Sequence, residues 1–92
     1  MTTKELRKKT RFIPDPNTLA VASVNSQYNV GLVVNESHSG CRVAFLSLVP
    51  LQKGDVCEIS VGKLSPIRAE VVWRTEAGTT LCELGFNYKE FA

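Results

Sequence analysis

The chain has 92 residues, of which 43% are hydrophobic and 22% charged, and its formal net charge is +2 at pH 7. This length suits one small domain and leaves little room for a deep enzyme cleft. No apolar run is long enough to span a membrane, and the polar, basic residues 1–12 do not form a secretory signal peptide, so we expect a cytoplasmic protein.

The first 17 residues are rich in positive charge. Only Glu5 opposes the basic side chains of this segment, which are Lys4, Arg7, Lys8, Lys9 and Arg11. Residues 14–17, Pro-Asp-Pro-Asn, stop any helix and begin a turn. We therefore predict a flexible basic arm over residues 1–17, which is either a solvated tail or an anion-binding segment.

From Thr18 onward, short apolar and β-branched segments alternate with turn residues. They predict six strands, at residues 18–24, 29–35, 40–48, 56–61, 67–74 and 80–88. No helix-length periodicity interrupts them, so we predict an all-β fold for residues 18–92. We expect a six-stranded antiparallel β-barrel, because closure removes the exposed strand edges that promote aggregation.

Alternation within the strands predicts which side chains share a face. Three strands each place their apolar residues together: Cys41, Val43 and Phe45; Cys57, Ile59 and Val61; and Cys82, Leu84, Phe86 and Tyr88. Residues 29–35 place Val30, Leu32 and Val34 on one face. Residues 67–74 place Ile67, Ala69, Val71 and Trp73 on one side, with Arg68, Glu70 and Arg74 on the other. This pattern assigns Trp73 to the barrel core, although an indole can also stack on a nucleotide base.

The three cysteines, Cys41, Cys57 and Cys82, lie far apart in apolar segments. No two of them have the spacing of metal ligands, and His38 is the only histidine of the chain. We therefore expect reduced thiols that pack as small apolar side chains, and no metal site.

Residues 7–11 read Arg-Lys-Lys-Thr-Arg, an R-x-x-x-R motif. The planar guanidinium of arginine matches phosphate oxygens, and also the O6/N7 edge of guanine, in a bidentate way. Lys8 and Lys9 either contact phosphate or only raise the local positive potential. A solvated basic tail would contain the same residues, so this motif alone does not decide between the two interpretations.

Residues 35–40 read Asn-Glu-Ser-His-Ser-Gly, an N-x-S-x-x-G motif between two predicted strands. The amide of Asn35 both donates and accepts hydrogen bonds, and Ser37 adds a hydroxyl. Gly40 allows a sharp turn and the close approach of a ligand. These groups suit a guanine edge, which carries both donors and acceptors, but an ordinary polar turn uses the same residue types. His38 is either an exposed loop residue or a further ligand contact.

In this order, and separated by one predicted hairpin, the two motifs resemble the signature of the PilZ domain family, R-x-x-x-R followed by [D/N]-x-S-x-x-G. Residues 69–73, Ala-Glu-Val-Val-Trp, and 84–86, Leu-Gly-Phe, look like two later strands of that family. The resemblance covers Arg7 to about Phe86. Two features depart from it: Asn35 stands where Asp is commoner, and the chain stops at Ala92, which leaves at most a vestigial C-terminal helix.

The resemblance implies a six-stranded β-barrel that binds the bacterial second messenger cyclic di-GMP and needs no cofactor. Arg7 and Arg11 would hold guanine edges and phosphates, Asn35 and Ser37 would hold a guanine, and Gly40 would give backbone access. The possible secondary contacts are Lys8, Lys9, His38 and Trp73. Ligand binding would order the arm and create a surface for an unidentified protein partner, in processes such as motility and biofilm formation.

Three other functions were weighed against this one. A PilZ-like module that binds protein but no nucleotide usually lacks the two arginines, which this chain has. A nucleic-acid-binding barrel would use clustered aromatic residues on basic strands, whereas the aromatic residues here are scattered. An enzyme is not expected, because the sequence offers no recognisable nucleophile–base pair or P-loop.

Overall fold

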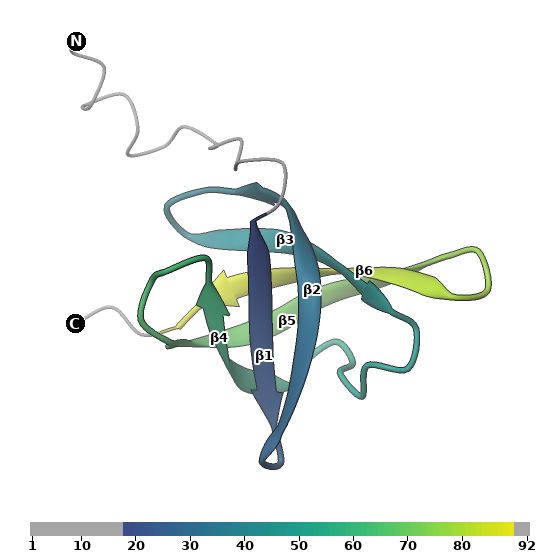
Figure 1. The fold of residues 1–92 in the computed structure, drawn as a ribbon, viewed down its shortest axis with the longest axis horizontal. Helices are drawn as coiled ribbons and strands as arrows, with labels where there is room; N and C mark the ends of the chain where they lie inside the picture. Colours follow the sequence, from purple (N-terminus) through teal and green to yellow (C-terminus); the bar gives the residue numbers. More distant parts are fainter. Residues whose placement is uncertain (1–17, 90–92) are drawn as a thin grey trace, which may run out of the picture.

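The computed structural model describes residues 18–89, which form a closed six-stranded antiparallel β-barrel (Figure 1). The predicted fold class is confirmed for this range. The predicted arm, with Arg7, Lys8, Lys9 and Arg11, lies outside the described residues, and so do residues 90–92. Residues 18–89 contain no helix, and hence none that could cross a membrane.

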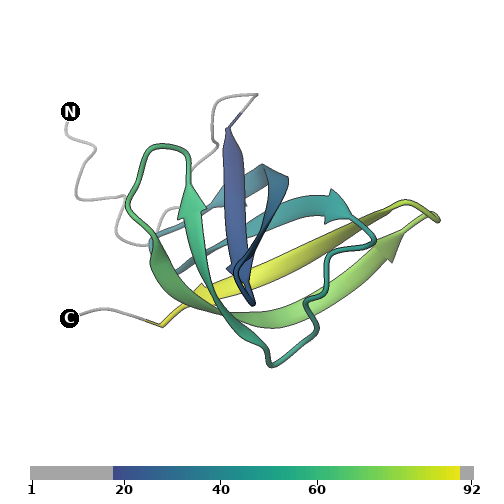
Figure 2. The ribbon, with the colours of Figure 1, turned by 60° about the horizontal axis from the view of Figure 1, so that its bottom comes forward.

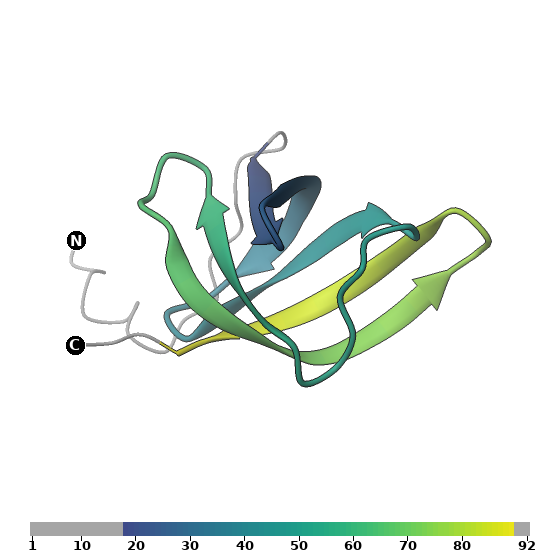
Figure 3. The same ribbon diagram turned by 90° about the horizontal axis from the view of Figure 1, so that it is seen from below.

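The six strands pair in the order β1-β2-β3-β6-β5-β4, and β4 pairs with β1 to close the barrel. Their bounds are β1 Leu19–Val24, β2 Gln27–Glu36, β3 Gly40–Leu46, β4 Val56–Val61, β5 Ile67–Ala77 and β6 Leu81–Tyr88. β5 and β6 continue beyond the rest of the barrel as a long hairpin (Figure 2). A long loop leads from β3 past β5 and β6 to the start of β4 (Figure 3).

The β1–β2 hairpin is tighter than the sequence predicts. Asn25 and Ser26 have positive φ angles of 50° and 67°, as both central residues of a two-residue type I′ turn do. Val24 therefore pairs directly with Gln27, and β2 begins two residues before its predicted start at Asn29.

The core lies inside the barrel and includes the residues predicted to share a face in β3 and β4, and those of β6 except Tyr88, which is partly buried and packs against it. β1, β2, β5 and the β3–β4 loop complete the core with Ala20, Ala22, Val33, Val49, Leu51, Ala69 and Val71. Cys41, Cys57 and Cys82 are buried there as free thiols, as predicted. In β2 the buried residues are Gly31 and Val33, and the face shared by Val30 and Leu32 lies outside. A side chain at Gly31 would overlap Val43 and Phe45, so the glycine leaves room for the core on this strand.

Two β-bulges shift the alternation of β2 and β5. The register between β2 and β3 slips between Val33 and Asn35, and that between β5 and β6 slips between Val71 and Trp73. Each bulge inserts one extra residue, so the side chains that follow it change face. The prediction that Trp73 lies in the core is therefore wrong: its side chain is on the outer surface and 36% exposed.

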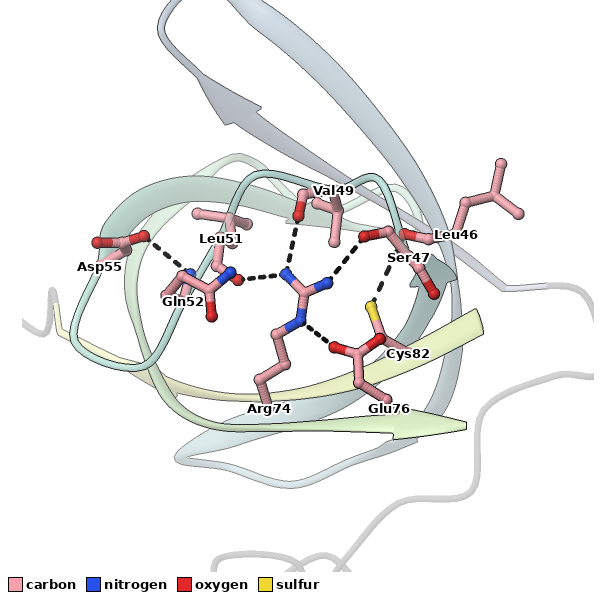
Figure 4. Close-up of polar contacts among 9 residues, drawn as sticks. All are labelled: Leu46, Ser47, Val49, Leu51, Gln52, Asp55, Arg74, Glu76 and Cys82. Carbon is pink, nitrogen blue, oxygen red and sulfur yellow. Dashed lines mark hydrogen bonds and ion pairs between the residues drawn. The ribbon is translucent and has the colours of Figure 1, made fainter. Parts of the chain in front are cut away.

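The bulge in β5 also turns Arg74 inward, although the sequence pattern placed it on the polar side. Its guanidinium donates hydrogen bonds of 2.8 Å to three carbonyl oxygens of the β3–β4 loop, those of Ser47, Val49 and Leu51 (Figure 4). Its Nε lies 2.7 Å from the carboxylate of Glu76. We call these contacts the Arg74 network. The network attaches the β3–β4 loop to strand β5.

Candidate functional site

An open depression of about 270 Å³ lies on the outer surface where β2, β3, β5 and β6 meet. All three residues singled out in the N-x-S-x-x-G motif line it: Asn35, Ser37 and Gly40. Trp73 and Arg42 also line it, and they come from β5 and β3. We call this hollow the outer depression.

One cross-strand row forms the floor of the outer depression. Asn35 of β2 pairs with Arg42 of β3, Arg42 pairs with Gly85 of β6, and Gly85 pairs with Trp73 of β5. Neighbouring strands are about 4.8 Å apart, so the row spans roughly 14 Å. The bulges in β2 and β5 immediately precede Asn35 and Trp73, and they turn these two side chains to the same outer face.

The 35–40 segment is held by hydrogen bonds within itself and to β6. The backbone N–H of Ser37 donates to the carbonyl of Gly40 at 2.8 Å, and the Ser37 hydroxyl lies 3.4 Å from the same oxygen. The N–H of Tyr88 donates to the carbonyl of Ser39 at 2.8 Å. These contacts fix the loop, so Asn35 and Ser37 face the depression from a rigid support.

Gly40 lines the outer depression, but the sharp turn that the sequence suggested is not the reason for glycine at this position. Its φ angle is not among the positive ones, so no sharp left-handed turn requires glycine here. A Cβ at this position would overlap the carbonyl oxygen of Phe86 on β6. Glycine is therefore needed because β3 and β6 approach closely at this point.

Trp73 lies over Gly85, and this contact forms one wall of the depression. A Cβ on Gly85 would overlap the indole ring at Nε1 and Cε2, so the ring is packed against the bare backbone of β6. The 36% exposure of Trp73 leaves part of the ring open to solvent. An aromatic face that is supported from below is a suitable stacking platform for a planar ring.

Glu36 and Tyr88 form a polar contact at the same end of the barrel. The bulge in β2 pairs Glu36 with the buried Cys41. The Tyr88 hydroxyl lies 3.4 Å from the carboxylate of Glu36 and donates a hydrogen bond to it. Burial, together with the neighbouring Cys41 and Glu36, raises the pKa of Tyr88 above its ordinary value. The phenol thus stays protonated and donates to Glu36.

The other predicted contacts have mixed outcomes. His38 is exposed and does not line the outer depression. Arg7, Lys8, Lys9 and Arg11 lie outside the described residues. Arg42 was missed by the sequence analysis because it follows the motif by two positions, and only the cross-strand register brings it beside Asn35.

The lining of the depression combines one indole, one guanidinium, the amides of Asn35 and Asn87, and the hydroxyls of Ser37 and Ser39. This set can stack a planar ring and meet both donors and acceptors on its edge. Among residues 18–89 no group of three or more side chains is arranged to hold a metal ion. Comparison with protein-family models, curated proteins and solved structures finds no match to this chain.

Proposed function

We propose that the chain is a receptor for cyclic di-GMP, the function implied by its resemblance to the PilZ domain family. One observation carries the proposal: Asn35 and Ser37 of the motif share a single depression with the exposed ring of Trp73. The motif was identified from sequence alone, whereas the alternation of β5 assigned Trp73 to the core and the resemblance gave it only as a possible secondary contact.

The chemistry of the outer depression suits a guanine base. The open part of the Trp73 ring offers a stacking surface, and base–aromatic stacking contributes about 1–3 kcal/mol. Asn35 and Ser37 supply donors and acceptors for the edge of the base. In this proposal Gly40 gives the ligand backbone access in the lining of the depression and also allows close strand packing, and His38 is not a contact.

The point where the arm joins the barrel supports a role for the R-x-x-x-R motif. The carbonyl of Thr18 accepts a 2.9 Å hydrogen bond from the N–H of Val33, two residues before Asn35. Seven residue steps separate Arg11 from Thr18, and an extended chain covers up to about 25 Å in that length. Arg11 is therefore within reach of a nucleotide in the depression, and Arg7 is four residues further away.

We further propose that the nucleotide, a dianion with two guanines, draws the arginines of the arm onto the barrel. Lys8 and Lys9 would add positive potential. Fixing the arm would create a surface for a protein partner, which is how a bacterial cytoplasmic receptor of this kind would relay the signal to processes such as motility or biofilm formation. The proposal needs no enzymatic step and no cofactor.

Calorimetric titration with cyclic di-GMP tests the proposal. We expect micromolar or tighter binding by the wild-type chain, loss of at least tenfold in affinity in Arg11→Ala, and much weaker binding of cyclic di-AMP. A bidentate arginine contact is worth about 1–3 kcal/mol, which sets the size of the expected loss. Absence of binding at millimolar nucleotide would refute the receptor function.

A second candidate, a PilZ-like module that binds protein and no nucleotide, is favoured by a different surface. Tyr28, Leu46 and Leu48 are 74%, 63% and 89% exposed, and together with Val30 they line a second depression of about 300 Å³. Exposed apolar clusters of this kind are typical of protein-binding sites. Failure of nucleotide binding, combined with thermal stabilisation by a protein partner that Leu48→Ser abolishes, would favour this candidate.

A further inference from the structure

Arg42 occupies the centre of the row that forms the floor of the outer depression, between Asn35 and Gly85. Its side chain is 40% exposed, and its Nε lies 3.2 Å from the carboxylate of Glu83, a residue of β6. That Nε is buried and makes no hydrogen bond with any described residue. The guanidinium thus pairs with one carboxylate through Nε, and this buried atom makes no hydrogen bond with residues 18–89. The exposed part of the side chain lies at the outer depression.

A role in stability does not account for this arrangement. An ion pair at such exposure contributes about 0–1 kcal/mol. A buried N–H without a hydrogen bond costs free energy, so the described fold gains little from this guanidinium. Its position in the depression, beside Asn35 and across Gly85 from Trp73, instead favours a role in binding.

We propose that Arg42 is a ligand-binding arginine that donates hydrogen bonds to the O6/N7 edge of the guanine stacked on Trp73. Only β6 separates the strands of Arg42 and Trp73, a distance of roughly 10 Å between strand axes, so a base lying on the indole extends toward Arg42. Glu83 is its positioning residue. This inference rests on the proposed cyclic di-GMP function and adds the source of its base selectivity.

The chemistry of the two purines explains the selectivity. Guanine presents two acceptors, O6 and N7, which match the fork of a guanidinium. Adenine presents a donor amino group at the position of O6, and a guanidinium has only donors to offer it. Arg42 would therefore favour guanine over adenine, whereas a phosphate contact would not distinguish them.

The test is calorimetric titration of cyclic di-GMP and cyclic di-AMP into the wild type, Arg42→Met and Arg42→Lys. We expect Arg42→Met to weaken cyclic di-GMP binding at least tenfold and to reduce the preference for it over cyclic di-AMP. Arg42→Lys should also lose affinity, because one ammonium cannot form the bidentate contact. Lys53→Met, which removes an exposed positive charge in the β3–β4 loop, is the matched control and should bind as the wild type does.

Glu83→Gln tests the positioning role, because glutamine keeps the size of the side chain and removes its charge. We expect a smaller loss of affinity than in Arg42→Met and a reduced guanine preference, since both readouts depend on how Arg42 is oriented. Melting curves should show that all four variants remain folded, so that changes in affinity report on binding.

The outcomes separate this inference from the function on which it rests. Wild-type affinity in Arg42→Met would overturn the inference and leave the receptor function standing. Equal losses for both nucleotides would overturn it as well, because they would place Arg42 on phosphate. If the wild-type chain binds no cyclic di-GMP, both the receptor function and this inference fail.

Discussion

Arg74 and Arg42 show how differently the barrel uses a guanidinium in two regions. Arg74 is 11% exposed and donates to three carbonyl oxygens of the β3–β4 loop, with Glu76 beside its Nε. Arg42 is 40% exposed and forms an ion pair with the carboxylate of Glu83. The donors of Arg74 are spent on holding the fold together, whereas the exposed part of the Arg42 side chain lies at the outer depression.

The two regions share a cause, because the bulge in β5 determines both. It turns Trp73 outward to the outer depression and, one residue later, turns Arg74 inward to the β3–β4 loop. A single inserted residue thus places a partly exposed indole on one face and a structural anchor on the other. The comparison predicts that substitutions on the two faces will separate stability from binding.

The largest effect on stability should come from Arg74→Met. Hydrogen bonds to charged groups contribute about 1.5–3 kcal/mol each, and three carbonyls would lose their partner, so we expect the free energy of unfolding to fall by about 3 kcal/mol or more. Urea unfolding followed by circular dichroism measures this loss.

Two variants make the comparison with Arg74→Met strict. Lys53→Met removes an exposed positive charge from the β3–β4 loop, which Arg74 contacts from β5. Arg42→Met removes the half-exposed guanidinium. Both should change the free energy of unfolding by less than about 1 kcal/mol. If Arg42→Met were as destabilising as Arg74→Met, the assignment of Arg42 to binding would lose its basis.

Next in size is a contrast between Gly40 and Gly85, two glycines that line the outer depression. In Gly40→Ala the new methyl group would meet the backbone carbonyl of Phe86, which cannot move without shifting β6. Overpacking of this kind costs about 1–3 kcal/mol. In Gly85→Ala the methyl group would meet the indole of Trp73, a side chain that can swing outward, so the loss of stability should be smaller.

For ligand affinity we expect the opposite order: relative to its loss of stability, Gly85→Ala should weaken binding more than Gly40→Ala does. Displacement of Trp73 in Gly85→Ala removes the stacking platform, and we expect cyclic di-GMP affinity to fall about tenfold, within the 1–3 kcal/mol range of base stacking. Trp73 is the only tryptophan, so its fluorescence reports both its displacement and any quenching by ligand. A change in fluorescence that reports displacement of Trp73 in Gly85→Ala, combined with unchanged affinity, would show that Trp73 does not form the platform.

Much of the fold could be predicted from the sequence, because its main signal is local. Alternating apolar residues identified six strands and the buried faces of β3, β4 and β6. Asn35 and Ser37 were found because they sit at fixed spacing in one short motif, and the structure places both in the outer depression.

The failures have one physical source, which is cross-strand register. In residues 67–74 the alternation continues through Val71 and Val72, and either valine can face inward, so nothing marks the bulge. The faces of Trp73 and Arg74 were therefore assigned the wrong way round. The pairing of Arg42 with Asn35 also depends on a bulge, the one in β2. For β5 and β6 the sequence does hold a hint, because a glycine such as Gly85 leaves room for a tryptophan on the neighbouring strand.

The smallest expected effect is a difference in alkaline sensitivity between the two regions. Burial raises the pKa of the Cys41 thiol, beside the outer depression, from 9.0 to about 11. Burial also raises the pKa of Cys82, but the positive charge of Arg74 opposes that shift. A thiol that ionises less readily when folded adds stability that is complete below pH 9 and is lost as the pH rises toward 11. We therefore expect Cys41→Ala to flatten the fall in unfolding free energy between pH 9 and pH 11 more than Cys82→Ala does.

Urea titrations at several pH values measure these slopes. A larger flattening in Cys82→Ala would show that the charge of Arg74 does not offset the effect of burial on the pKa of Cys82.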